Sequence, residues 1–201
     1  MTTHMPVLES TRLRIRPFEM GDLEDVYRLL DVELREAELG SERMDTLAAR
    51  ETWLRWAVLN YDQLGMLYQP PYGDRAVVLK QTGEMVGSCG FVPCLMPFEQ
   101  IPYFAAAGAA ASPRPVTTEF GLFYAVFPAH QRRGYAAEAA RAIVDYAFGT
   151  LHLKRVVATT TYDNLGSLGV MRRLGMRLER NPLPEPHYLQ VVGVVENPIY
   201  I

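Results

Sequence analysis

The stretch AVFPAHQRRGYAAEAARAIVDYAF, Ala125 to Phe148, decides the fold of this chain. It begins with an apolar run that ends at Pro128, continues as a short polar loop from Ala129 to Arg133, and shows helical spacing of apolar residues from Gly134 onward. We interpret it as a strand, an anion-binding loop and a helix. The first N–H groups of a helix have no partner inside the helix, and the helix dipole favours negative charge there, so the junction suits a phosphate group.

The loop contains the residue types that a phosphate site needs. Gln131, Arg132 and Arg133 stand just before the turn, and Gly134 with the small Ala136 lets phosphates approach the main chain. No Gly-Lys-Ser/Thr follows, and the stretch does not match GxGxxG, so neither a P-loop nor a dinucleotide motif is indicated. An ordinary capped helix with a solvated basic start explains the same residues. The continuation of the chain decides between the two interpretations.

A second strand and a second helix follow. RVVATTT, Arg155 to Thr161, has the valine and threonine content of a strand, and YDNLGSLGVMRRLGM, Tyr162 to Met176, predicts a helix closed by Gly175. The order Q-x-x-G-x-A, helix, strand, N-x-x-S, helix, L-G-M resembles the acetyl-coenzyme A core of the GNAT superfamily, in particular its ribosomal-protein N-terminal acetyltransferase-like branch. The resemblance is strongest over Thr118 to Met176 and extends more loosely to TRLRIRPFEMGDLEDVYRLL at the front.

Composition narrows the class of protein. With 201 residues, 49% hydrophobic and 21% charged, the chain is long enough for one well-buried domain, which we expect over residues 1–201. A net charge of −3 argues against nonspecific nucleic-acid binding. Short apolar stretches and the lack of a signal peptide predict a cytoplasmic protein without a membrane partner. Cys89 and Cys94 are too few for a disulfide framework, no spaced cluster indicates a metal site, and we expect both cysteines to pack as small apolar residues.

The elements predicted for residues 11–92 are a half-buried strand at Thr11–Phe18, a helix capped by Asp22 that runs to about Leu30, a helix from Glu42 to about Leu64, and strands Arg75–Lys80 and Met85–Val92 joined by QTGE. The second helix carries the aromatic residues Trp53, Trp56 and Tyr61. They either line a pocket for the acceptor amine or, more simply, pack in the hydrophobic core. Residues 93–116, rich in proline, alanine and glycine, predict a flexible loop. Its Phe98, Tyr103 and Phe104 form either a substrate lid, as its position in the resembled family implies, or part of an excursion without function.

The resemblance implies an α/β (α+β) fold, with a mixed, mostly antiparallel central sheet flanked by helices. Residues 117–176 are then the acetyl-CoA core, in which strand Thr117–Phe127 and its parallel neighbour splay apart at the cofactor cleft. Residues 177–201 supply the C-terminal strands, and pairing through the last one, Tyr188–Val195, offers a route to a homodimer. The expected cofactor-binding residues are Tyr124, Ala125, Val126, Gln131, Arg132, Arg133, Gly134, Tyr135, Ala136 and Asn164.

The chemistry requires a base, because an alkyl ammonium group has no free lone pair at neutral pH. Glu119 is our candidate base. Counting back from Gly134 places Gly121 where the resembled branch commonly carries a glutamate. Glu119 lies on the same strand face but about 6.8 Å earlier, a gap that a bulge or a water molecule would have to close. The alternative is that Glu119 is an exposed strand residue.

The departing thiolate needs a proton donor. Many GNAT enzymes have a tyrosine seven residues after the asparagine of this helix, but here that position is Met171. Ser167 matches the serine that the resembled branch places near the sulfur, and we assign it as donor, with Tyr162 as a weaker candidate. The alternatives are that Ser167 bonds the backbone at a helix start and that Asn164 is a helix cap.

Two functions follow. The first is transfer of an acetyl group from acetyl-CoA to a primary amine, either a protein N-terminus or a small molecule, by direct attack while both substrates are bound. The second is a non-catalytic acyl-CoA sensor or partner-binding module, which the displaced Glu119 keeps open. The identity of the acceptor does not follow from the sequence.

Overall fold

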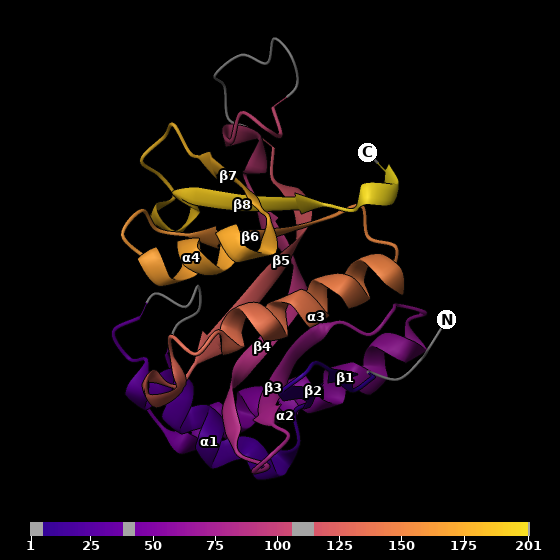
Figure 1. Ribbon diagram of the computed structural model, residues 1–201, viewed down its shortest axis with the longest axis vertical. Helices are drawn as coiled ribbons and strands as arrows, with labels where there is room; N and C mark the ends of the chain where they lie inside the picture. The colour runs from indigo at the N-terminus through magenta and orange to yellow at the C-terminus, as the bar shows by residue number, and fades with distance from the viewer. Residues whose placement is uncertain (1–5, 38–42, 106–114, 201) are drawn as a thin grey trace. The chain divides into compact units, whose positions relative to one another are not determined.

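A computed structural model describes residues 6–37, 43–105 and 115–200. It divides the chain into two compact units, which are described separately: unit 1 is Met1–Phe91 with Phe123–Tyr146, and unit 2 is Val92–Leu122 with Ala147–Ile201. The expected single domain stays a prediction. Figure 1 shows the helices and strands of both units.

Within the part of the chain that the structure describes, hydrogen bonding orders eight strands as β1-β2-β3-β4-β5-β6-β8-β7. β5 and β6 are parallel, whereas β1–β2, β2–β3, β3–β4, β6–β8 and β7–β8 are antiparallel. The predicted mixed, mostly antiparallel sheet flanked by helices is therefore confirmed. The strands are β1 (Leu8–Glu9), β2 (Leu13–Pro17), β3 (Gly73–Leu79), β4 (Met85–Met96), β5 (Thr117–Val126), β6 (Arg155–Thr160), β7 (Arg177–Arg180) and β8 (Val191–Glu196). The helices are α1 (Leu23–Tyr27), continued by the π-helical η2 (Arg28–Glu33), α2 (Leu47–Met66), α3 (Tyr135–Gly149) and α4 (Leu165–Leu174).

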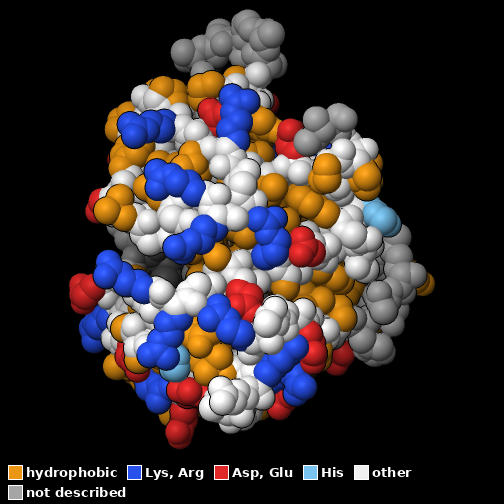
Figure 2. Space-filling view, viewed as in Figure 1, with side chains coloured by type: hydrophobic (Ala, Val, Ile, Leu, Met, Phe, Trp, Pro, Cys, Tyr) orange, Lys and Arg blue, Asp and Glu red, His pale blue; other side chains and the backbone are white. Residues whose placement is uncertain are grey.

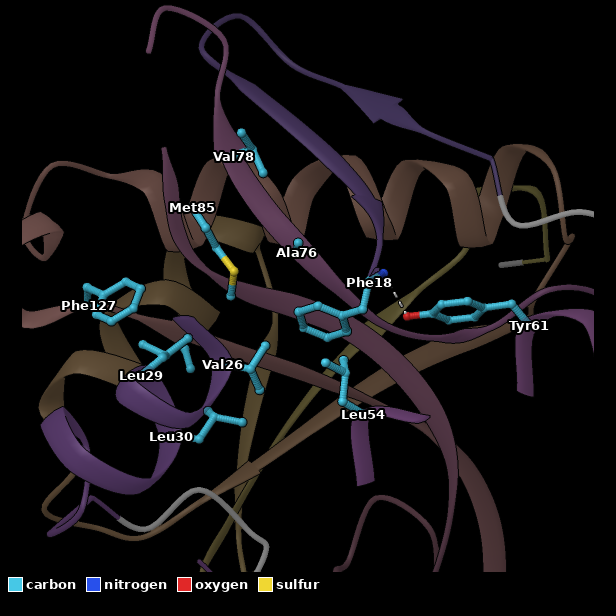
Figure 3. Close-up of a cluster of buried hydrophobic side chains, with 11 residues drawn as sticks. Phe18, Val26, Leu29, Leu30, Leu54, Tyr61, Ala76, Val78, Met85 and Phe127 are labelled. Atoms are coloured by element: carbon cyan, nitrogen blue, oxygen red, sulfur yellow. Dashed lines mark hydrogen bonds between the residues drawn. The ribbon is translucent and has the colours of Figure 1, made fainter. Parts of the chain in front are cut away.

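The core of unit 1 lies between β3 and β4 on one side and α1, η2 and α2 on the other. Leu13 and Ile15 alternate with arginines along β2 and are fully buried, as the pattern predicts. Figure 3 shows the cluster around Phe18, in which the Tyr61 hydroxyl accepts the Phe18 N–H at 3.1 Å. Tyr61 also donates to the carbonyl of Asp74, so one buried side chain ties α2 to β3.

Two details of the predicted helices of unit 1 are wrong. Asp22 occupies the N-cap position of α1, but its side chain makes no capping hydrogen bond there. Its carboxylate accepts instead from both terminal nitrogens of Arg16 at 2.7 Å and from the Glu19 N–H at 2.8 Å, because a guanidinium is the stronger partner. The second helix, α2, starts at Leu47 and not at Glu42. Thr46 is its N-cap, and the Thr46 side chain accepts the Ala49 N–H at 3.2 Å.

The aromatic residues of α2 have different environments. Tyr61 is core, and Trp53 packs edge-on against Phe18 with ring centroids 5.9 Å apart. Trp56 is 58% exposed, so the apolar pattern of α2 is broader than the face that it buries.

Unit 2 has a separate core beneath β6 and β8. Gly193 of β8 lies between Val192 and Val194 and faces the other side of the sheet, where a Cβ would lie 2.9 Å from the sulfur of Met171 and 3.0 Å from that of Met176. The helix α4 ends as predicted, with Gly175 in the left-handed conformation at φ 77°. The buried members of this core are Phe98, Ile101, Val157, Leu189, Val192 and Val194.

Two expectations for the loop after Val92 need correction. β4 continues to Met96, so a strand replaces the first part of the predicted loop. Phe98 is fully buried in the unit 2 core and therefore cannot serve as a mobile lid. Residues 106–114 of this loop lie outside the described residues.

The C-terminal strands also differ from prediction. β8 starts at Val191 instead of Tyr188, and β7 lies within the predicted C-terminal strands, although its own bounds were not predicted. β8 pairs with β6 along one edge and with β7 along the other, so the last strand has no open edge through which a homodimer could pair.

Within the described ranges, none of the helices combines the length and the apolar character needed to cross a membrane.

Candidate functional site

The predicted phosphate loop lies in unit 1, between β5 and α3. The 3-10 turn Pro128–His130 follows β5 directly. Two residues near the end of the loop are left-handed: Arg132 at φ 60° and Gly134 at φ 84°. A non-glycine residue in that region is uncommon, and such residues cluster at active sites and ligand-binding segments. Interspersed left-handed residues also shape the backbone concavities that bind anions.

The start of α3 adds helix-terminal donors to this loop. The Glu138 N–H donates to the Gly134 carbonyl at 3.0 Å, which is the first i to i−4 bond of the helix. The N–H groups of Tyr135 and Ala136 precede that bond and belong to the set that a helix leaves without partners. Arg132 and Arg133 are exposed, and Figure 2 shows Lys and Arg side chains on the face in view, over α3. Exposed arginines and helix-terminal N–H groups are features that anion-binding loops share.

Gln131 ties this loop to the end of β5. Its side-chain Nε2 donates to the Val126 carbonyl at 3.1 Å. On the β4 side of β5, the Phe127 N–H donates to Val86 at 3.1 Å, and a Cβ on Gly87 would lie 2.2 Å from the Ala125 carbonyl oxygen. β4 therefore packs closely against this segment of β5, where Tyr124 is half-buried.

The candidate base, Glu119, lies in unit 2 and is not an exposed strand residue. Its side chain is 9% exposed, and both of its carboxylate oxygens accept from Arg155, one from Nε at 2.8 Å and the other from Nη2. The hydrogen bonds with Glu119 raise the pKa of Arg155 against the opposing effect of burial. Proton acceptance by Glu119 must therefore compete with a bidentate ion pair.

Gly121, two residues after Glu119, lies where there is little room for a larger side chain such as glutamate. It pairs with Val157 of the parallel strand β6, and a Cβ at Gly121 would lie 2.8 Å from the sulfur of Cys94. The Cys94 thiol in turn donates to the Glu119 carbonyl at 3.3 Å. Both cysteines are free, and Cys89 is fully buried, as predicted for packing residues.

Asn164 and Ser167 stand at the start of α4 in unit 2. The Asn164 side-chain oxygen accepts the Ser167 N–H at 3.0 Å, so Asn164 is the helix cap of the alternative interpretation, with its NH₂ group still able to donate. Tyr162, the weaker donor candidate, donates its hydroxyl to the Asn181 carbonyl at 2.9 Å. The hydroxyl proton of Tyr162 is therefore used in a hydrogen bond within the protein.

The predicted site residues divide between the two units. Residues 124–126 and 131–136 belong to unit 1, and Glu119, Asn164 and Ser167 belong to unit 2. Among the residues that the structure describes, no group of three or more His, Cys, Asp or Glu side chains could hold a metal ion. His130 contacts Glu84, with 3.0 Å from Nε2 to the carboxylate.

Sequence reasoning missed the partners of the site residues. Arg155 marks only the start of a predicted strand, and Arg12 is only one of three arginines on a basic strand face. Tyr103 donates to Glu196, and its ring lies 5.9 Å from the Arg155 guanidinium, which also stacks over Phe104 at 4.9 Å. The aromatic pair of the predicted lid thus covers the Arg155 side chain instead.

The sequence profile of the acetyltransferase (GNAT) domain matches residues 12–177. The chain belongs to the GNAT acetyltransferase family. A 52-residue match to YnaD of Bacillus subtilis (strain 168), named an uncharacterized N-acetyltransferase, has 46% identity and spans 26% of this chain and 31% of YnaD.

Two solved structures of acetyltransferases resemble this chain along its length. An acetyltransferase from Agrobacterium tumefaciens str. C58 superposes with a TM-score of 0.67 at 27% identity. The alignment covers 96% of this chain and 95% of the Agrobacterium chain. RimL, named a ribosomal L7/L12 alpha-N-protein acetyltransferase and solved with coenzyme A, has a TM-score of 0.60 at 16% identity, with coverage of 95% and 98%. At this identity the likeness to RimL concerns the fold alone.

Proposed function

We propose that this GNAT protein transfers the acetyl group of acetyl-CoA to a primary amine by direct attack while both substrates are bound. The observation that carries the proposal is the loop from Gln131 to Ala136, whose two left-handed residues and helix-terminal N–H groups fit a diphosphate. The coenzyme A in the RimL structure supports the same ligand class. We also propose that the protein acts as a single domain in the cytoplasm.

The residues of each unit then have separate tasks. In unit 1 the loop N–H groups hold the diphosphate, and the main chain of Tyr124 to Val126 pairs with the pantetheine amides as an added strand. Acetyl-CoA supplies an activated thioester. In unit 2 Asn164 holds the pantetheine arm through its NH₂ group, and Ser167 donates a hydrogen bond to the departing thiolate.

The proton of the acceptor ammonium needs an acceptor of its own. We propose Glu119, reached through water, with Arg155 holding the carboxylate in place. Main-chain N–H groups stabilise the oxyanion, as in other acyl transfers. The acceptor class remains a primary amine, either a protein N-terminus or a small molecule.

The direct experiment incubates the protein with acetyl-CoA and a panel of primary amines, including peptides with free and with blocked N-termini, and follows thiol release. We expect release with at least one free amine and none with its blocked counterpart. If coenzyme A binds and no amine on the panel responds, the proposal fails and the second function is favoured.

Replacing Glu119 by Gln tests the base. We expect kcat to fall by about 100-fold or more, the usual contribution of a general base, while the dissociation constant for coenzyme A stays unchanged. Glu179→Gln is the matched control, because Glu179 also pairs with an arginine of unit 2. Thermal unfolding of both variants separates lost chemistry from lost folding.

The second candidate function, a non-catalytic acyl-CoA sensor, is favoured by one observation. Arg155 engages both oxygens of Glu119, and Gly121 leaves no carboxylate two residues on. Under this function the protein binds coenzyme A without turnover, and Glu119→Gln changes neither property.

A further inference from the structure

Glu138, on the first turn of α3, faces the start of β2 instead of solvent. Its Oε1 accepts from the Ser10 hydroxyl at 2.7 Å and from the Arg12 N–H at 2.8 Å. Its Oε2 accepts from the Arg12 side chain, at 2.7 Å from Nε and 2.6 Å from Nη2. All three residues lie in unit 1, and four donors converge on one carboxylate.

Arg12 extends from this carboxylate to the phosphate loop. Its Nη2 donates to the Arg133 carbonyl at 3.0 Å, and its guanidinium lies 4.5 Å from the centre of the Tyr135 ring. A Cβ on Gly134 would lie 3.5 Å from the same Nη2. One side chain therefore contacts Arg133 and Tyr135, on either side of Gly134, in the turn that we propose binds the diphosphate.

The segment that presents Arg12 is itself fixed. Ser10 and Leu13 close a turn between β1 and β2, with the Ser10 N–H donating to Leu13 at 3.0 Å and the Leu13 N–H donating to the Ser10 hydroxyl at 3.1 Å. The Lys80 N–H also donates to the Arg12 carbonyl at 3.0 Å. Arg12 thus links a hydrogen-bonded hairpin to a loop that contains two left-handed residues.

The charges of Glu138 and Arg12 also link Arg12 to the phosphate loop. Burial alone raises the pKa of Glu138, but hydrogen bonds from Ser10 and Arg12 outweigh it and hold that pKa below its usual value. The carboxylate is therefore anionic at neutral pH. An anion on the first turn of a phosphate-binding helix repels the ligand unless a cation compensates it, and Arg12 is that cation.

We propose that Arg12, held by Glu138, is a positioning residue for the cofactor: it sets the turn from Arg133 to Tyr135 in its phosphate-binding conformation and cancels the charge of Glu138 beneath it. The proposal rests on the proposed function. A loop that is already in its bound conformation binds more tightly, because apparent affinity scales with the fraction of competent molecules.

The test compares Arg12→Met with Arg14→Met by isothermal titration with coenzyme A and by steady-state kinetics. Arg14 is the matched control, because it lies on the same strand with a 56% exposed side chain and pairs only loosely, at 3.4 Å, with Glu9. We expect the dissociation constant and the KM for acetyl-CoA to rise about tenfold in Arg12→Met if a tenth of the molecules keep the competent turn, with kcat at saturation nearly unchanged. Arg14→Met should leave all of these constants at their wild-type values.

A double-mutant cycle with Glu138→Gln gives the second readout. If the two residues act as one unit, the double variant loses no more affinity than Arg12→Met alone and recovers part of the loss, because the carboxylate charge that Arg12 cancels is then also gone. Arg12→Lys, which keeps the charge, should recover part of the affinity. Thermal unfolding reports whether each variant is folded.

The outcomes distinguish this inference from the proposed function. Failure of the wild-type protein to bind coenzyme A overturns both. Wild-type binding with unchanged affinity in a folded Arg12→Met variant overturns the positioning role alone. An equal fall in kcat and in kcat/KM, with unchanged coenzyme A affinity, would also contradict it, because that pattern belongs to a residue that acts on the transition state.

Discussion

At the scale of single residues, the polar side chains of unit 1 range from fully paired to unpaired. Glu138 accepts three hydrogen bonds and forms an ion pair with Arg12, whereas Asp74 on β3 has a buried Oδ1 without a partner among the residues that the structure describes. Arg75, next to it, is fully buried, with Nη1 donating to the Pro6 carbonyl at 2.9 Å and its guanidinium 5.0 Å from the Tyr146 ring. An unpaired buried carboxylate destabilises the folded state when it is charged.

Asp74 should therefore make stability depend on pH. Burial raises its pKa to about 6, whereas an aspartate in the unfolded chain titrates near ~3.9. The folded state holds this proton more tightly, so the free energy of unfolding falls as pH rises from about 4 through 6. We expect Asp74→Asn to be more stable than wild type above pH 6, by about 1–2 kcal/mol after allowing for partial solvent access, and equal to it below pH 4.

Thermal or urea unfolding between pH 4 and 8 measures this effect. Asp62→Asn, at an exposed position of α2, is the control and should follow the wild-type curve. A curve for Asp74→Asn that stays parallel to wild type over the whole range would contradict the assignment.

At the scale of elements, a buried ion pair joins η2 to α2. Asp31 accepts from Nε and Nη2 of Arg50 at 2.7 Å each and from the Met44 N–H at 2.7 Å, and both charged side chains are almost fully buried. The Arg50 guanidinium also lies 4.9 Å from the centre of the Trp53 ring. This ion pair holds η2 against α2.

Breaking one side of that pair should cost more than removing both. Arg50→Met leaves a buried carboxylate without its cation, and we expect a loss of about 3–5 kcal/mol of unfolding free energy. Adding Asp31→Leu should recover a large part of the loss, because the uncompensated charge is then gone. Urea denaturation gives both values, and Arg55→Met, which disrupts only the exposed pair with Glu51, should stay within about 0.5 kcal/mol of wild type.

At the scale of the whole molecule, the predicted ligand should stabilise the fold. A ligand that binds only the folded state adds about 2.7 kcal/mol at a concentration 100 times its dissociation constant. We therefore expect coenzyme A to raise the midpoint of thermal unfolding in a concentration-dependent way, and the rise to be smaller for Arg12→Met at the same concentration. Free pantetheine, which lacks the diphosphate, is the control, and an equal rise with it would argue against the loop as the anchor.

Local patterns predicted most elements of this chain. The junction around Gly134, the stop of α4 at Gly175 and the alternating strand at Leu13 and Ile15 depend on neighbouring residues alone, through helix ends, glycine conformation and side-chain period. The bounds of the short strand β7 and the last residues of β4 were missed, because their pairing partners, rather than their own residues, define them as strands.

The sequence by itself determined the family, most of the helices and strands, and the position of the loop between β5 and α3. Only the tertiary structure decided which side chains meet. It pairs Glu119 with Arg155, 36 positions away, and Glu138 with Arg12, 126 positions away, and it buries Phe98 in a core. The reason is that helix and turn signals act over a few residues, whereas a charge pair between strands or between a strand and a helix depends on register and packing, which no local pattern encodes.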